Sequence, residues 1–423
     1  MTITDVMARR IWDSRGRPTL EVEVVNDDGT RGVGIAPAGA SRGMREAAEL
    51  RDGGHRFNGL DVQQAIAGLE HEIAPALVGR DAREQAGIDA MLIALDGTPN
   101  RSRLGGNTLI ATSLAVLHAA AAIERAVLWQ YLADGDRVSL PLPQIQIFGG
   151  GAHAGRRVDV QDFMVVATGA QSFSESLEMT AEVYRCAGEL MHQRGPLAGV
   201  ADEGGWWPSF SRNEDALDVL VQAIERAKLV PGDDVSIALD LASSQFGGKG
   251  RYQLALERQE FDSDALLERL VRWIDKYPIV SIEDPLAEDD EAGLIAFTRA
   301  VGERVQIVGD DYLVTNEDRM KHAASVGACN CLLVKPNQAG TVTETRAALD
   351  AAKQAGYRTI VSARSGETED VAIVHLAIGW NAGQLKVGSF ARSERMAKWN
   401  EALRIESRSR LPFAGRAALR RPA

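Results

Sequence analysis

The second half of the chain repeats one pattern, in which a short apolar run ends at a charged residue and a segment of helical periodicity follows. The runs end at Asp240 in SIALD, Glu283 in IVSIED, Asp310 in QIVGDD and Lys335 in CLLVK. This alternation predicts successive βα units of a parallel barrel. In such barrels the catalytic side chains lie at the carboxyl ends of the strands.

Eight apolar runs follow residue 136, which is the number of strands in a (β/α)₈ barrel. They are QIQIF, DFMVVA, VSIALD, IVSIED, QIVGDD, CLLVKPN, TIVSAR and QLKVGS. A doubly wound sheet gives the same periodicity, so it stays open at this point. The basic tail, SRSRLPFAGRAALRRPA, is predicted to lie loosely on the surface.

The first 135 residues have a different pattern. Apolar and polar residues alternate on both sides of Asp27-Asp28-Gly29, which predicts antiparallel strands joined by a tight turn. From Arg45 to Tyr131 the periodicity is helical. We therefore expect an α/β protein with an α+β cap domain over residues 1–135 and a modified (β/α)₈ TIM-like barrel domain over residues 136–423.

Composition narrows the classes of partner. The net charge of −12 argues against nucleic acid, because phosphate binding requires an excess of Lys and Arg. No run of 18 apolar residues indicates a membrane span, and the N-terminus does not have the form of a signal peptide. Three cysteines are expected to be buried free thiols in a reducing compartment, so the predicted location is the cytoplasm.

Asp240, Glu283 and Asp310 are candidate ligands of a hard cation. Mg²⁺ prefers carboxylate oxygens and keeps several waters, and no His or Cys neighbours these residues, which argues against zinc. The alternative is that each carboxylate caps the helix that follows it.

The next strands end in cationic groups. Lys335, if desolvated near cations, would have a lowered pKa and could act as a general base, although a structural ion pair with a carboxylate is the alternative. Arg364, Ser365 and Lys386 could clamp a phosphate or carboxylate. Ordinary turn residues and solvated charges are the alternative for these three.

Over roughly residues 5–407 the chain resembles enolase, the phosphopyruvate hydratase of glycolysis. In the second half the matching segments include SIEDP, GDD, LVKPNQAGT and SGETED, and in the first half DSRGRPTLEVEV, PAGASRGMREAAELRDGG and ALDGTPNRSRLGGN. Between them lie GGGAHAG and ADEGGWWP. The resemblance implies a homodimer or a ring of dimers.

The resemblance also implies roles for individual residues. Asp240, Glu283 and Asp310 match the ligands of one Mg²⁺, and Ser41, in a mobile loop, matches a residue that helps to hold a second. Lys335 matches the base and Glu203 the acid that acts on the leaving hydroxyl. The implied contacts of the substrate are Arg364 and Ser365 with phosphate, Lys386 with carboxylate, and His153 in a second mobile loop.

Two departures from the family fall in the half of the site that handles the leaving group. Ala363 stands where enolases have the histidine of SHRSGETED, and Asp162 where they have the glutamate of QEF. Asp162 withdraws its carboxylate by about 1.5 Å, and such a misplacement can cost on the order of 100-fold in rate. Asp162 remains a candidate catalytic residue.

Three hypotheses about function follow. The first is an enzyme specialised for a phosphorylated or phosphonate carboxylic acid, similar to carboxyphosphonoenolpyruvate synthase of phosphinate antibiotic biosynthesis, with a nucleotide-activated co-substrate. Arg156, Arg157 and the pair Trp206-Trp207 could serve that larger ligand, or they could be solvated cations and loop anchors. The second is an ordinary enolase that converts 2-phosphoglycerate to phosphoenolpyruvate. The third is an inactive scaffold protein.

Overall fold

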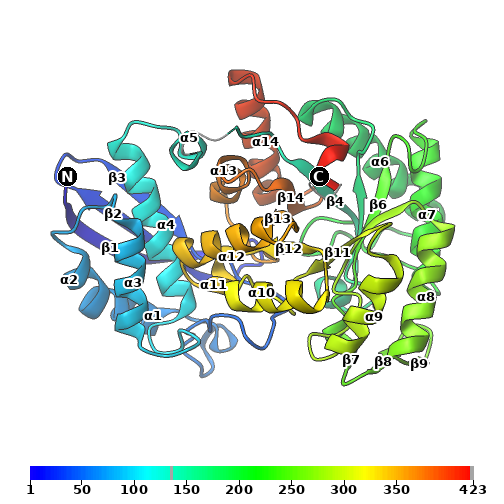
Figure 1. Ribbon diagram of the computed structural model, residues 1–423, viewed down its shortest axis with the longest axis horizontal. Coiled ribbons are helices and arrows are strands. Elements are labelled where there is room, and N and C mark those ends of the chain that lie inside the picture. The colour runs from blue at the N-terminus through cyan, green and yellow to red at the C-terminus, as the bar shows by residue number, and fades with distance from the viewer. Residues whose placement is uncertain (134–136, 420–423) are drawn as a thin grey trace.

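The computed structural model describes residues 1–133 and 137–419, and in it the chain forms two parts that lie side by side (Figure 1). The first part contains an antiparallel sheet of β1 (Ile3–Trp12), β2 (Pro18–Asn26) and β3 (Arg31–Ile35), as the alternating pattern predicts. Gly29 takes a φ of +81° in the turn between β2 and β3. The predicted boundary between residues 135 and 136 lies outside the described residues and stays a prediction.

Helices follow this sheet in the chain. They are η1 (Arg56–Gly59), α1 (Gln63–Gly68), η2 (Leu69–Ile73), α2 (Ala74–Leu77), α3 (Gln85–Asp96), α4 (Gly106–Ile123) and α5 (Leu128–Leu132). Of these, α1, η2, α2 and α4 pack directly on the sheet. Helix α4 lies directly on β3, because Gly32 has no side chain: a Cβ there would lie 2.1 Å from the carbonyl oxygen of Ala115. Helix α4 is long and apolar enough to cross a membrane, but 83% of it is buried, so it is a core helix of this part.

The second part contains a closed eight-stranded barrel, so the doubly wound alternative is excluded. Each of the eight predicted apolar runs contributes one strand. The strands are β4 (Leu142–Gly149), β5 (Asp162–Val166), β6 (Ser236–Asp240), β10 (Ile279–Glu283), β11 (Gln306–Gly309), β12 (Cys331–Val334), β13 (Arg358–Ser362) and β14 (Gly383–Gly388).

One strand departs from the parallel arrangement that the sequence predicts. Strand β5 runs antiparallel to both β4 and β6. A parallel connection needs a crossover, usually a helix, whereas between β4 and β5 the chain forms only the short helix η3 (Gly151–Ala154). As a result the first residue of β5, Asp162, pairs with Asp240, the last residue of β6. The reversal places Asp162 at the same end of the barrel as the other strand-end residues.

Helices surround the barrel, as Figure 1 shows. They are α6 (Phe173–Gln193), α7 (Asn213–Arg226), η4 (Ser243–Gln245), α8 (Ser263–Lys276), α9 (Glu291–Val301), α10 (Glu317–Val326), α11 (Pro336–Ala339), α12 (Val342–Gln354), α13 (Ala372–Gly379), α14 (Ser393–Arg408) and η5 (Gly415–Leu419). Helix α8 is typical: Asp262 caps its first turn, and Leu266, Leu270 and Trp273 form its buried stripe.

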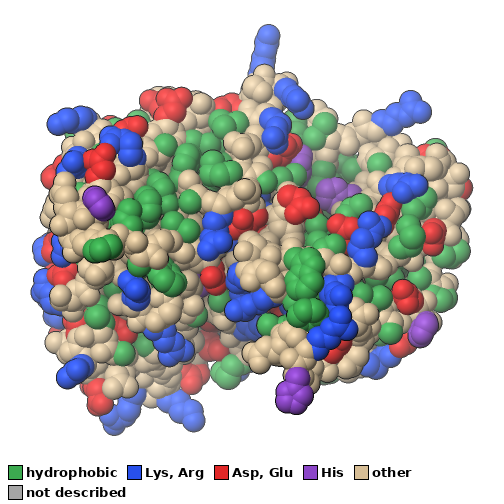
Figure 2. All heavy atoms as spheres, turned by 180° about the vertical axis from the view of Figure 1, so that it is seen from behind, with side chains coloured by type: hydrophobic (Ala, Val, Ile, Leu, Met, Phe, Trp, Pro, Cys, Tyr) green, Lys and Arg blue, Asp and Glu red, His purple; other side chains and the backbone are tan. Residues whose placement is uncertain are grey.

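A small antiparallel sheet that the sequence analysis did not predict follows β6. It consists of β7 (Gly247–Gly248), β8 (Arg251–Leu254) and β9 (Gln259–Asp262). Cys186, Cys329 and Cys331 are buried free thiols, as expected. Figure 2 shows acidic and basic side chains interspersed over the face of the molecule opposite to that of Figure 1.

The prediction of a loose C-terminal tail is wrong for the residues of the tail up to 419, which are the ones that the structure describes. The backbone of Leu140 exchanges hydrogen bonds with Pro412 and Ala414 (2.9 Å each). Phe413, with Ala418 and Leu419, packs against a buried cluster formed by Leu142, Met164, Val166 and Ala238. Apolar residues spaced along a basic segment therefore anchor it to the barrel.

We predict that Phe413→Ala destabilises the protein, because the ring is half-buried against this cluster. Discounting the cost of a fully buried Phe→Ala change for partial exposure gives about 2 kcal/mol, or an apparent Tm lower by about 2–5 °C in differential scanning calorimetry. Arg410→Ala, at an exposed position in the same segment, is the control and should leave Tm unchanged. Equal Tm values for both variants would contradict the packing described.

Candidate active site

Most of the predicted site residues are buried around the carboxyl ends of the barrel strands. Asp240, Glu283 and Lys386 belong to strands, Asp310 and Lys335 directly follow them, and Arg364 and Ser365 come two and three residues after β13. Glu203, in a loop, and His153, in η3, lie on the same side. Each of these side chains is less than a tenth exposed. The barrel therefore gathers acidic and basic groups from distant parts of the sequence at one end.

Lys386 is the centre of one charged group. Its Nζ lies 2.8 Å from Asp240, 2.7 Å from Glu283 and 3.5 Å from Asp162. Burial opposes the charged form of Lys386, but Asp240 and Glu283 outweigh burial and raise its pKa well above the usual value. The amide of Gln161 also donates to Asp240, over 2.9 Å.

The carboxylates around Lys386 respond differently to burial. Burial disfavours the ionised form of Asp240, but Lys386 outweighs this effect and lowers the pKa of Asp240 to about 2. Burial and the charge of Asp240 raise the pKa of Glu283 well above its usual value. Within the described part of the chain, Glu283 Oε1 is buried and receives no hydrogen bond. This acceptor is free for a further cation.

Lys335 and Asp310 form the second charged group. Lys335 Nζ lies 2.5 Å from Asp310 Oδ2, and the Gln338 amide donates to Asp310 Oδ1 over 2.8 Å. Burial of Lys335 favours its neutral form, but Asp310 outweighs burial, so the pKa of Lys335 is raised. The ion pair with a carboxylate, which is the alternative that the sequence leaves open for Lys335, is therefore formed in the structure.

The predicted metal ligands fit a hard divalent cation in their donor chemistry but do not form a compact oxygen cluster. Lys386 holds Asp240 and Glu283, while Lys335 holds Asp310. A different trio, Asp284, Asp310 and Asp311, has oxygens within 4.8 Å of one another. Asp284, however, accepts the backbone N–H groups of Asp310 and Asp311 (2.9 Å each), so it shapes this turn.

Arg364 is held by contacts that the sequence does not predict. Its guanidinium lies 3.0 Å from both Glu46 and Asn337 Oδ1, and it donates to the carbonyl oxygen of Ser41 over 2.9 Å. Glu46 and Ser41 come from the first part of the chain. Sequence spacing gives no signal for the pair of Arg364 and Glu46, because these residues lie more than 300 positions apart in the chain.

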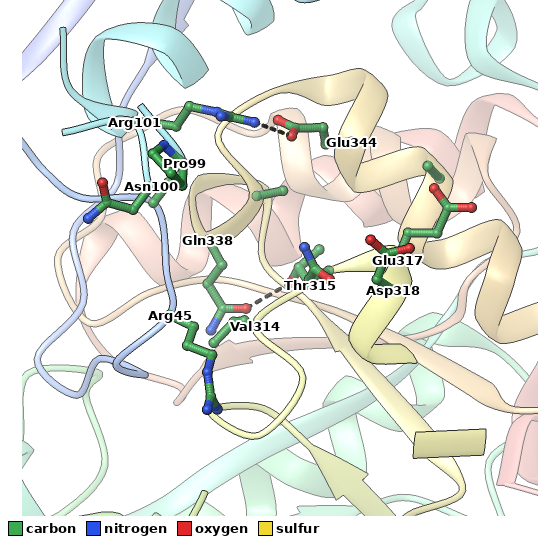
Figure 3. Close-up of a pocket in the computed structure, with 14 residues that line it drawn as sticks. Arg45, Pro99, Asn100, Arg101, Val314, Thr315, Glu317, Asp318, Gln338 and Glu344 are labelled. Carbon is green, nitrogen blue, oxygen red and sulfur yellow. Dashed lines mark hydrogen bonds and ion pairs between the residues drawn. The ribbon is translucent and has the colours of Figure 1, made fainter. Parts of the chain in front are cut away.

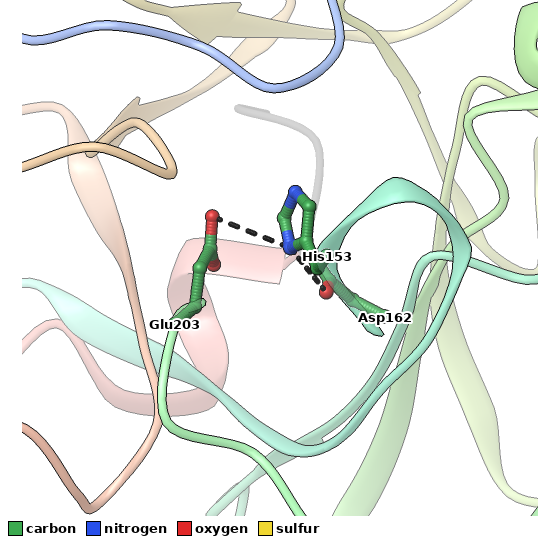
Figure 4. A group of neighbouring side chains, drawn as sticks. All are labelled: His153, Asp162 and Glu203. Atoms are coloured by element: carbon green, nitrogen blue, oxygen red, sulfur yellow. Dashed lines mark ion pairs between the residues drawn. The ribbon is translucent and has the colours of Figure 1, made fainter. Parts of the chain in front are cut away.

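His153, Asp162 and Glu203 converge at the other side of the site (Figure 4). His153 Nδ1 lies 3.7 Å from a carboxylate oxygen of each acid, and its Nε2 lies 3.0 Å from Ser365 Oγ. Burial and the charge of Glu203 raise the pKa of Asp162 to about 6. Ala363, two residues before Ser365, is also buried and carries only a methyl group.

Arg156 and Arg157 are exposed, and the structure does not bring them into the charged groups described above. Arg157 lies over the ring of Trp207, with 5.0 Å between Cζ and the ring centroid. Trp206 stacks on Tyr184 at 4.8 Å and donates its indole N–H to the Tyr184 carbonyl. Trp206 is therefore a loop anchor, which is the alternative to ligand binding given above for the Trp206-Trp207 pair.

The cavity in Figure 3 lies outside the active site. It has a volume of about 220 Å³ and lies between the first part of the chain and the barrel. Its lining includes Arg45, Arg101, Thr315 and Gln338, and none of the predicted site residues. Two lining residues connect it with the site: Gln338 donates to Asp310, and Thr315 accepts the backbone N–H of Lys335. The candidate active site is therefore defined by the buried charges rather than by this cavity.

The raised pKa of Asp162 predicts the pH dependence of a variant's stability. Because the folded-state pKa of about 6 lies above the ordinary value of 3.8, ionised Asp162 costs stability above pH 6, and the cost disappears below the ordinary value. Asp162→Asn should therefore raise Tm relative to wild type at pH 7 with a chelator present. This difference should shrink as the pH falls through 6 towards 4. A difference that stays constant over this range would contradict the raised pKa.

Comparisons with known proteins agree with this arrangement. Residues 3–132 match the family described as "Enolase, N-terminal domain", and residues 137–421 match "Enolase, C-terminal TIM barrel domain". A curated relative, Enolase 1 of Desulfitobacterium hafniense (strain Y51), is 47% identical over 420 residues, which are 98% of this chain and 96% of that protein. The chain therefore belongs to the enolase family of enzymes.

Proposed function

We propose that this protein is a Mg²⁺-dependent lyase that converts 2-phosphoglycerate to phosphoenolpyruvate in the cytoplasm. The observation that carries the proposal is the set of buried ion pairs at the barrel mouth. Lys335 pairs there with Asp310, and Lys386 pairs with Asp240 and Glu283. The near full-length similarity to a relative named Enolase 1 favours this reaction. Family membership also favours a homodimer or a ring of dimers.

Two Mg²⁺ ions are proposed for the site. Asp240, Glu283 and Asp310 would hold one ion, and the free Glu283 Oε1 supports this assignment. Ser41 would help to hold the second. Bound there, the ions would stabilise the negative charge that develops on the substrate carboxylate when the neighbouring proton leaves.

Lys335 would be the base that removes that proton. If Asp310 held a cation, Lys335 would lose the partner that raises its pKa, and the positive charge of the cation would lower that pKa further. Lys386 would then be released from Asp240 and Glu283 to bind the substrate carboxylate. Arg364 and Ser365 would bind the phosphate, since Arg364 already holds a carboxylate in the structure.

The leaving hydroxyl would be handled by Glu203, with Asp162 and His153 beside it. Glu203 and Asp162 each place a carboxylate oxygen 3.7 Å from His153 Nδ1, so a shift of less than about 1 Å would bring either acid within hydrogen-bond distance. Asp162, with its pKa raised to about 6, would change its protonation state near neutral pH. Ala363 offers no group that could transfer a proton.

The first test is turnover of 2-phosphoglycerate with Mg²⁺, followed through phosphoenolpyruvate formation. The wild-type protein should turn over at about 10 s⁻¹ or faster, and Lys335→Ala should be at least about 100-fold slower, because it lacks the base. Lys321→Ala is the control, since Lys321 is exposed and pairs with Glu317 on the barrel exterior. Absence of both turnover and exchange of the C2 hydrogen with D₂O would contradict the proposal.

A second candidate function rests on Ala363 and Asp162. Ala363 is smaller than the histidine of enolases and Asp162 is shorter than their glutamate, and both residues belong to the half of the site that handles the leaving group. These two changes favour a specialised reaction like that of carboxyphosphonoenolpyruvate synthase, with a cytidylyl-activated phosphonoformate as co-substrate. Phosphorus NMR of a mixture of that compound, 2-phosphoglycerate and Mg²⁺ would reveal a new phosphonate ester. The exposed position of Arg156 and Arg157 leaves them available to an anionic group at the edge of the site.

The double variant Ala363→His with Asp162→Glu separates the two candidates. If the wild-type protein is specialised, we expect the variant to form phosphoenolpyruvate about 100-fold faster, the rate that a misplaced catalytic group can cost. Its rate of C2 hydrogen exchange should stay within about threefold, since Lys335 is unchanged. A wild-type protein that already dehydrates 2-phosphoglycerate rapidly, with little gain in the variant, would contradict the specialised function.

A further inference from the structure

A strap formed by residues 37–46 crosses the mouth of the barrel. Its first half is tied to the site itself. Ala38 exchanges backbone hydrogen bonds with Gly366 (2.9 and 2.8 Å), and the Ala40 amide donates to Ser365 Oγ over 3.2 Å. Arg364 donates to the carbonyl oxygen of Ser41. The strap therefore lies over the groups that would bind the substrate phosphate.

The tip of the strap is held by its backbone rather than by side-chain burial. The side chain of Met44 points into solvent, with 72% of the residue exposed. Gly43 fits closely on the barrel, because a Cβ at this position would lie 2.6 Å from Val314 Cγ1 and 3.1 Å from the Asp311 carbonyl oxygen. An apolar anchor is thus missing at the tip, and polar backbone contacts must replace it.

Glu288, on the loop after β10, supplies such a contact. Its two carboxylate oxygens lie 3.2 and 3.1 Å from the backbone nitrogen of Met44. Within the described part of the chain, no other group donates a hydrogen bond to this carboxylate, although Glu288 is only 7% exposed. Closing the strap over Glu288 therefore both buries this charge and provides the hydrogen bond that the buried carboxylate needs.

The loop that carries Glu288 is itself fixed by η4 and by the small sheet of β7, β8 and β9. The Glu288 amide donates to Ser244 Oγ over 3.0 Å, and the Ala287 amide donates to the Tyr252 hydroxyl over 3.1 Å. Tyr252 lies in β8, is 2% exposed and donates in turn to Asp290 over 2.7 Å. The carboxylate is thus presented to the strap from a rigid support.

From these contacts we infer that Glu288 is a positioning residue that latches the strap in its closed position over the barrel mouth. It does not touch the groups proposed to bind substrate. It acts through the Met44 amide on the segment that carries Ser41. Opening the strap breaks this hydrogen bond, so the latch sets how often the site is accessible. The consequence for catalysis rests on the proposed function, whereas the latch itself does not.

Hydrogen–deuterium exchange of the protein without substrate tests the latch directly. In Glu288→Ala the amides of the strap tip should exchange about 10-fold faster, the factor expected for loss of a hydrogen bond to a charged acceptor. Glu288→Gln keeps an oxygen acceptor without the charge and should give an intermediate rate. It also serves if the alanine variant folds poorly.

Asp289→Asn is the matched control. Asp289 is the next residue, and its carboxylate accepts the Lys249 amide over 2.9 Å instead of an amide of the strap. This variant should speed exchange at Lys249 and leave the strap tip unchanged. Unchanged strap exchange in both Glu288 variants, or equal acceleration in Asp289→Asn, would overturn the latch.

Kinetics then separate failure of the latch from failure of the proposed function. If both hold, Glu288→Ala should raise KM for 2-phosphoglycerate about 10-fold and change kcat by less than about threefold, with partial rescue in Glu288→Gln. Faster strap exchange in a protein whose wild type does not turn over 2-phosphoglycerate would support the latch and refute the proposed function. Faster strap exchange with KM unchanged would refute the role of the latch in substrate retention.

Discussion

Burial of several carboxylates at one end of the barrel is the constraint on which the rest of the structure depends. An unpaired buried charge costs several kcal/mol, and removal of one partner from a buried pair typically costs about 3–5 kcal/mol. Lys386 and Lys335 satisfy this requirement in the structure by pairing with Asp240, Glu283 and Asp310. The same two lysines are the groups that the proposed chemistry needs, so stability and reactivity draw on one set of contacts.

The fold supplies these groups from separate directions. Seven of the barrel strands present their carboxyl ends at the mouth, and the reversed strand β5 presents its first residue there, which adds Asp162. The first part of the chain contributes Glu46, which neutralises Arg364, and the strap that covers the site. The small sheet beside the barrel supports the loop that holds the tip of the strap. The two parts of the chain therefore complete one site between them.

Much of the fold could be predicted from sequence, because apolar runs of strand length separated by helical segments have few alternative packings. All eight barrel strands and the meander around Gly29 were identified in this way. The reversal of β5 could not be, since strand direction depends on the connection between β4 and β5 rather than on the strand itself. The anchoring of Phe413 was missed because its apolar neighbours are spaced within a basic segment.

The residues of the candidate site that lie at strand ends could be predicted from the sequence. The contacts that hold these residues in place could not. Asp240, Glu283, Asp310 and Lys335 each end an apolar run, which is a local signal. Glu46 and Glu288 act through contacts with distant segments, for which periodicity carries no information. The pKa of Lys335 was also beyond sequence, because its direction depends on whether Asp310 or a cation is the nearer charge.

In the proposed function, a divalent cation would replace the lysines as the partner of the carboxylates and thereby prepare the site for catalysis. Calorimetric titration of Mg²⁺ at pH 7, in two buffers with different ionisation enthalpies, measures the protons released on binding. Since Glu283 has a raised pKa and the lysines lose the partners that keep them charged, the account predicts release of about one proton per ion bound. Asp240→Asn should weaken this binding. Binding without proton release, or no binding at all, would contradict the account.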